Sequence, residues 1–150
     1  MIGTTVNDIS PIRALLQERW HQKYHENRQV GKVILYFWCK HPDLDKFYED
    51  ELLKFHEEHL VTLMHADFIR EADHMVYVDH FLSKHGYDAW DLIDRQQASV
   101  FVCGDATAGL KVEKAFLKIA AEIGGKGTDN AQLYLKELRL DGRFITEFSN

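Results

Sequence analysis

Three short runs of aliphatic, aromatic and β-branched residues stand out from the rest of the chain. They are KVILYFWC at residues 32–39, LVTLMHADF at residues 60–68 and ASVFVC at residues 98–103. Short, nearly continuous apolar runs of this composition are typical of strands buried on both faces. The pattern therefore predicts three buried strands.

Between these runs, apolar residues recur every three or four positions, as in helices that bury one face. Ser10 and Pro11 predict the start of the first helix. A serine hydroxyl can cap the first turn, and proline is tolerated there because the N–H it lacks would have no partner within the helix. Two of the stripes are Leu15, Leu16, Trp20 and Tyr24, and Phe47, Leu52, Phe55 and His59.

Glycines mark the limits of the later helices. Gly86 divides the stretch after Val76 into two helical pieces, and Gly124 with Gly125 closes a long helix. A final helix is predicted over about residues 130–140. Strands that alternate with one-sided helices need crossover connections, so the expected fold is a three-layer α/β structure around a parallel sheet.

Composition favours one soluble, cytoplasmic domain. The chain has 150 residues, 45% of them hydrophobic, and a formal net charge of -6 with no basic cluster, which argues against a nucleic-acid partner. No apolar run is long enough to span a membrane. Cys39 and Cys103 form no C-x-x-C pair, so we expect reduced thiols. In open parallel sheets, ligands bind at the carboxyl ends of strands, where Cys39, Phe68 and Cys103 would lie.

Five ordered segments resemble the diflavin reductases, the group that includes microsomal cytochrome reductases, sulfite reductase flavoprotein and nitric oxide synthase reductase domains. VFVCGDA at residues 100–106 is similar to the block Y-V-C-G-D-A of that family. The others are SPIRALLQER, YFWCKHPDLDKFYEDEL, VYVDHFL and YLKELRLDGRF. The resemblance covers nearly the whole chain, and the stretches WDLIDRQQASVFV and RFITE are similar to the smaller diflavin reductases that supply cytosolic iron–sulfur assembly.

The resemblance implies the Rossmann-like C-terminal NAD(P)H-binding domain of a ferredoxin-reductase-type flavoenzyme, as a single domain over residues 1–150. Such a module presents NADPH to FAD held by a preceding domain, in cis or in trans. Electrons then pass to FMN and to a haem or iron–sulfur acceptor protein. We expect the flavin domains and most of the first strand to be missing, either because Met1 is a cut or because the strand is short. Without those flavin domains, the chain alone should have no reductase activity.

The resemblance assigns the chemistry to Cys103, which would lie against the nicotinamide, with Asp105 and Glu147 in support. Gly104 would let the dinucleotide approach the backbone. The family ends in an aromatic residue that stacks on the flavin. Here Ser149 takes that position and Phe148 lies one residue earlier, so stacking would be rearranged.

At the adenosine end, the resemblance assigns the 2′-phosphate to Arg70 and the adenosine to Tyr77. Ile69 and Met75 replace two phosphate donors of the family. Asp79 adds a negative charge, which suits a free ribose hydroxyl and so predicts weak NADPH binding or a drift toward NADH.

Gly3, Thr4 and Thr5 correspond to the start of the glycine-rich pyrophosphate loop, which is otherwise lost; Asp8 would repel phosphate there. Cys39 and Lys40 stand in the family's G-C-R segment, where Lys40 could still reach a phosphate. Trp38 replaces the glycine and could fill the nucleotide's space or pack in the core.

The histidines do not predict a metal. His21 with His25, and His56 with His59, could each share a helix face, but no third ligand is evident. Hydrolase and kinase motifs are absent from the sequence. Two alternatives to the reductase module stay open: a degenerate relative that acts as a binding or scaffold domain, and a sensor that binds NADH without chemistry.

Overall fold

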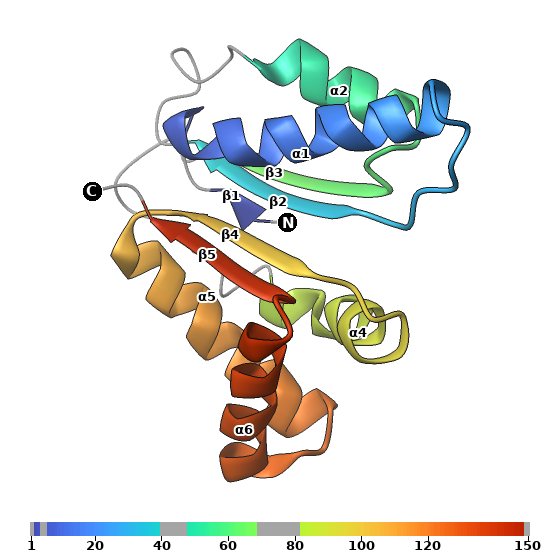
Figure 1. Cartoon of the computed structure of the whole chain (residues 1–150). Coiled ribbons are helices and arrows are strands. Elements are labelled where there is room, and N and C mark those ends of the chain that lie inside the picture. The colour runs from blue at the N-terminus through green and yellow to red at the C-terminus, as the bar shows by residue number, and fades with distance from the viewer. Residues whose placement is uncertain (1, 4–5, 40–47, 69–81, 149–150) are drawn as a thin grey trace. The chain divides into compact units, whose positions relative to one another are not determined.

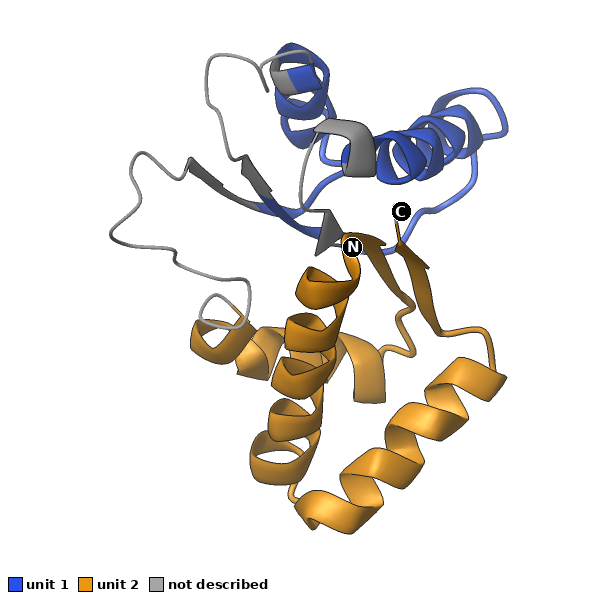
Figure 2. Cartoon of the chain, turned by 90° about the vertical axis from the view of Figure 1, so that its left-hand side faces the viewer, with its two compact units in different colours: residues 1–75 blue, residues 76–150 orange. Residues whose placement is uncertain are grey.

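The computed structural model describes residues 2–3, 6–39, 48–68 and 82–148. The chain divides into two compact units, residues 1–75 and residues 76–150, which Figure 2 shows in different colours. Each unit combines parallel strands with helices, so the predicted α/β class of Rossmann-like type is confirmed.

The first unit consists of three parallel strands and two helices. In chain order these are β1 (Ile2–Gly3), α1 (Val6–Tyr24), β2 (Ile34–Cys39), α2 (Glu49–Glu57) and β3 (Leu63–Phe68). Strand β2 pairs in parallel with β1 and with β3. Figure 1 shows α1 and α2 on the same side of these strands. Three successive residues of β2, Leu35 to Phe37, are buried.

Helix α1 begins at Val6, so the predicted start at Ser10 is wrong. Ser10 is exposed inside the helix, and Pro11 is its sixth residue, where proline removes one backbone hydrogen bond. The longer helix adds Ile9 to the stripe that Ile12 and Leu16 continue, and all three side chains are fully buried. Burying an isoleucine contributes about 2 kcal/mol, which offsets much of the cost of the internal proline.

The second unit consists of two parallel strands and several helical segments. These are α4 (Gly86–Trp90), the π-helical η2 (Asp91–Arg95), β4 (Val100–Gly104), α5 (Ala106–Lys118), the π-helical η3 (Ile119–Ile123), α6 (Gly127–Leu140) and β5 (Phe144–Phe148). Its core is built by buried side chains of α5, α6 and β5. They include Val112, Phe116, Leu135, Leu138 and Phe144.

Most predicted elements of both units are present with shifted ends. The three predicted strands are confirmed, each beginning two or three residues late. Residues 82–84 are helical and α4 begins at Gly86, while Gly124 caps the end of η3, as predicted. Strand β5 and the two π-helical segments were not predicted.

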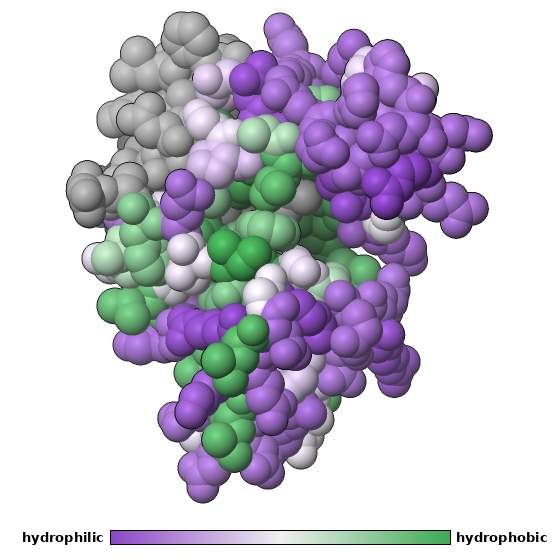
Figure 3. Space-filling model, viewed as in Figure 1, coloured by the Kyte–Doolittle hydropathy of each residue, from purple (hydrophilic) through white to green (hydrophobic). Residues whose placement is uncertain are grey.

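The outer face of α6 carries apolar side chains. Leu133 and Leu140 are 58% and 77% exposed. They lie opposite the buried stripe of the helix, and Figure 3 shows apolar surface where Figure 1 places α6. Within the described ranges, no helix is both long and apolar enough to cross a membrane.

Candidate nucleotide-binding site

Cys103 and Glu147 are brought together by the pairing of β4 with β5. The register aligns Cys103 with Glu147 and Gly104 with Phe148. Aligned residues of neighbouring strands point to the same face of a sheet, so the thiol and the carboxylate share one face. Cys103 is 4% exposed, whereas Glu147 is exposed. A buried, polarizable thiol therefore lies beside an accessible carboxylate, although 44 residues separate them in sequence.

Asp105 caps helix α5. Its carboxylate accepts a hydrogen bond from the backbone N–H of Ala108 at 2.8 Å, the geometry of an N-cap residue. The cap fixes the direction in which α5 leaves the end of β4. Asp105 thus holds the turn that follows Cys103 and buried Gly104, and its participation in chemistry stays a prediction.

Phe148 lies against the first turns of α5. A Cβ atom added to Gly109 would come within 3.0 Å of the Phe148 ring, so the ring occupies the notch that glycine leaves. Successive residues of a strand point to opposite faces. Phe148 therefore projects to the α5 side of β5, and Glu147 to the other side. Flavin stacking by Phe148 stays a prediction.

Arg143 fixes the start of β5. Helix α6 ends at Leu140 and is followed by Gly142 in the left-handed conformation, at φ +65°, and the Arg143 N–H donates to Leu138 O at 2.7 Å. The Arg143 carbonyl then accepts from Val100 N at 2.7 Å, which joins the first residues of β4 and β5.

The Arg143 guanidinium adds side-chain contacts to this junction. It donates to the carbonyls of Ile93 and Ala98 and to the Gln97 side chain, the last two at 3.1 and 2.9 Å. One side chain thereby ties the loop before β4 to the strand that carries Glu147. This junction lies at the start of the two paired strands that carry Cys103 and Glu147.

In the first unit, Gly3 and Cys39 lie at strand ends. Gly3 ends β1, aligned with Phe37, and Cys39 ends β2, aligned with Phe68. Helix α1 begins three residues after Gly3, and the N–H groups of a helix start favour anions. The remaining predicted cofactor residues of this unit and of the next segment lie outside the described residues: Thr4, Thr5, Lys40, Arg70, Tyr77 and Asp79.

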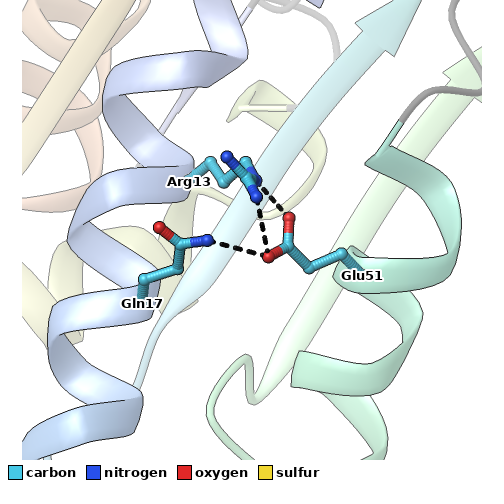
Figure 4. Close-up of polar contacts among 3 residues, drawn as sticks. All are labelled: Arg13, Gln17 and Glu51. Carbon is cyan, nitrogen blue, oxygen red and sulfur yellow. Dashed lines mark hydrogen bonds and ion pairs between the residues drawn. The ribbon is translucent and has the colours of Figure 1, made fainter.

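Arg13, the first arginine of the chain, is engaged by an acid. Figure 4 shows its guanidinium turned toward Glu51 of α2, to which Nε and Nη2 both donate, while Gln17 donates to the same carboxylate at 2.9 Å. The hydrogen bond from Arg13 lowers the pKa of Glu51 below its ordinary value. Arg13 thereby links α1 to α2, and its charge is balanced by that of Glu51.

The structure shows the local environment of the two histidine pairs. His56 Nδ1 lies 2.9 Å from the Val61 carbonyl oxygen, and His59 ends the α2 turn in the left-handed conformation, at φ +58°. The rings of His21 and His25 stack with centroids 4.9 Å apart. That the chain holds no metal stays a prediction.

The elements and contacts that hold the candidate site residues in place were not predicted from the sequence. The alternating, β-branched and aromatic composition of FITEF at residues 144–148 could have predicted β5. An aspartate directly before a predicted helix is a common N-cap, so the Asp105 cap could have been predicted from the sequence. The contact between Gly109 and Phe148 has no sequence signal, because it joins residues 39 positions apart.

No protein-family model matches the chain. Among curated proteins, it is similar to NADPH–cytochrome P450 reductases. That of Salmo trutta is 36% identical over 137 residues, which cover 91% of this chain and 23% of the relative. Those of Cavia porcellus and Homo sapiens are 36% and 35% identical over 138 residues, or 20% of their length. The chain thus spans about a fifth of the relatives it matches, and its resemblance to the diflavin reductases is confirmed.

Proposed function

Given this homology to the diflavin reductases, we propose that the chain is the nucleotide-binding module of an NADPH-dependent flavin reductase. In the proposed reaction it presents NADPH to FAD in another domain, from which electrons pass to FMN and then to a haem or iron–sulfur protein. The relatives are named for NADPH and for a cytochrome acceptor. The full reaction needs flavin domains beyond the fifth of the relatives that this chain matches.

The observation that carries the proposal is the alignment of Cys103 with Glu147. A reductase module must hold a flat nicotinamide ring at the carboxyl end of its strands and leave one ring face open to the flavin. Cys103 and Gly104 provide a small side chain and no side chain at the end of β4. Glu147 is accessible on the same face as Cys103.

Each of these residues has a distinct task in the proposed module. The thiol of Cys103 would lie against the nicotinamide without blocking it, because sulfur is small and polarizable. The Glu147 carboxylate would favour positive charge on the ring. Asp105 holds the α5 turn in place through its bond to Ala108. Bound NADPH would supply the hydride.

Arg70 and Tyr77 would hold the adenosine end, and the segment Met1 to Thr5 would lie near the pyrophosphate, together with Cys39 and Lys40. A guanidinium suits a phosphate because its N–H donors match two oxygens. Asp79 opposes the 2′-phosphate by charge. We therefore expect NADPH to bind weakly, with NADH as a competitor.

Isothermal titration of the purified chain with NADPH and with NADH tests the proposal. We expect Arg70→Ala to weaken NADPH binding by about tenfold, the loss of one charge-assisted contact, and to leave NADH binding unchanged. Arg95→Ala is the matched control, because Arg95 is exposed and its guanidinium pairs with its helix neighbour Asp91. It should bind both nucleotides like the parent chain.

The two rival functions give different results in the same titration. If the chain binds neither nucleotide, the module is rejected and a scaffold domain is favoured, as the altered phosphate loop would predict. If NADH binds more tightly than NADPH and Asp79→Asn reverses that order, the sensor is favoured over the reductase. Tighter binding of NADPH, lost in Arg70→Ala, supports the reductase module.

A further inference from the structure

Strand β5 is attached to α5 at two aromatic positions. Near its start, Phe144 is buried and meets Phe116 edge to face, with ring centroids 5.5 Å apart. At its end, the Phe148 ring occupies the notch at Gly109. The two strand residues are four apart and the two helix residues seven apart, so both pairs lie on matching faces. Between the two attachments lies Glu147.

These attachments differ in how easily they can be released. Phe144 is 4% exposed and belongs to the core, whereas Phe148 is 45% exposed and lies at the last described position of β5. Strand ends separate readily when their side chains make few contacts. In addition to its backbone pairing with β4, the end of β5 is therefore joined to α5 by the contact between Phe148 and Gly109.

We propose that Phe148 is a positioning residue, which, by packing in the Gly109 notch, holds the Glu147 carboxylate beside the Cys103 thiol. The proposal rests on the proposed function, because it takes these two groups to work as a pair. It assigns to Phe148 a task different from stacking on a flavin. Phe148 projects to the α5 side of the strand and Glu147 to the opposite side, so the ring acts on Glu147 only through the backbone.

The reactivity of the Cys103 thiol reports whether the carboxylate is near. The chain is treated with dithiobis(nitrobenzoate), a dianion, and with dithiodipyridine, which is neutral. In each reaction the thiolate attacks the reagent disulfide, a mixed disulfide forms and an aromatic thiolate leaves. Peptide mass spectrometry follows Cys103 apart from Cys39. A neighbouring negative charge slows the dianion more than the neutral reagent, whereas local opening speeds both reactions.

The ratio of the two rates is the measured quantity. In Glu147→Gln we expect the ratio of dianion to neutral reagent to rise roughly threefold at low ionic strength, and the rise to vanish at high salt. Phe148→Ala should raise the ratio in the same direction. In the Glu147→Gln background, Phe148→Ala should change the ratio no further, because the charge it would displace is already gone.

Gly109→Ala tests the notch without removing the ring. Alanine favours helix over glycine, so this variant should fold, but its Cβ must push the ring out, and we expect the same rise as in Phe148→Ala. Gly109→Ala combined with Phe148→Leu should restore the parent ratio, since a smaller side chain can refill the narrowed notch. Tyr87→Ala, which removes an aromatic 78% exposed in the same unit, should leave the ratio unchanged.

Three results would overturn the proposal. Faster reaction with both reagents at an unchanged ratio would mean that Phe148 only closes the strand end. No effect of Phe148→Ala would mean that the ring positions nothing, and no effect of Glu147→Gln would mean that the carboxylate is not beside the thiol. None of these measurements uses a nucleotide, so they are independent of whether NADPH binds.

Discussion

The two units join their helices by different proportions of apolar and polar contact. In the second unit, α5, α6 and β5 meet through buried apolar side chains, among them Phe116, Leu135, Leu138 and Phe144, and one ion pair, from Arg139 to Glu113 at 2.7 Å, links α6 to α5. In the first unit, α1 and α2 are linked by several partly exposed polar groups. Gln17 and Arg13 donate to Glu51, and Trp20 Nε1 donates to Glu58 at 2.7 Å.

The comparison indicates where stability and the candidate chemistry depend on packing. Truncating a buried apolar side chain removes transfer free energy and leaves a cavity, whereas an exposed ion pair contributes little and is screened by salt. The pairing of Cys103 with Glu147 belongs to the second unit, in which the buried side chains of Phe144 and Phe116 join β5 to α5. Its geometry should therefore withstand changes in salt but be sensitive to substitutions in the core.

The largest effect is expected for Phe116→Ala. Phe116 is 8% exposed and meets Phe144, so its truncation should lower the free energy of unfolding by about 3–5 kcal/mol. Urea denaturation measures the loss, which should be the same at low and high salt. Leu133→Ala, on the exposed face of α6, is the control and should change stability by less than about 0.5 kcal/mol. A similar loss in both variants would contradict the assignment of the core.

An intermediate effect is expected for Arg143→Met, which removes a polar contact of the second unit. It leaves the Ile93 and Ala98 carbonyls without their guanidinium donor, which should cost about 2 kcal/mol. Arg95→Met, at an arginine whose side chain is 80% exposed, is the matched control and should be nearly neutral. If Arg143→Met is as mild as its control, the junction between β4 and β5 does not depend on the guanidinium.

The smallest effect is expected for Glu51→Gln in the first unit. Because Arg13 lowers the pKa of folded Glu51, the pair stabilises the fold above the ordinary glutamate pKa of 4.5, and this contribution is lost as the pH falls through the folded pKa. The difference in unfolding free energy between the parent chain and Glu51→Gln should thus shrink below pH 4.5 and at high salt. Glu57→Gln, at an exposed position of α2, should show no such trend. A difference that persists in acid would exclude the ion pair as its cause.

Much of the architecture could be read from local patterns. Short runs of strand-favouring residues predict strands β2, β3 and β4. Gly86 marks the start of α4, and Gly124 marks the C-terminal end of η3. The start of α1 could not, because Ser10 and Pro11 form a plausible local signal that the burial of Ile9 overrides. Local preferences of about 1 kcal/mol yield to the burial of one large side chain.

For the candidate site, the sequence by itself determined which residues are present and the family they resemble, and that resemblance singled out Cys103, Asp105 and Glu147 as candidates. Only the tertiary structure decided how they are arranged. It aligned Cys103 with Glu147 and placed Phe148 in the notch at Gly109. The physical reason is that strand register and side-chain packing join residues about 40 positions apart, and these contacts exist only after the intervening helices have folded.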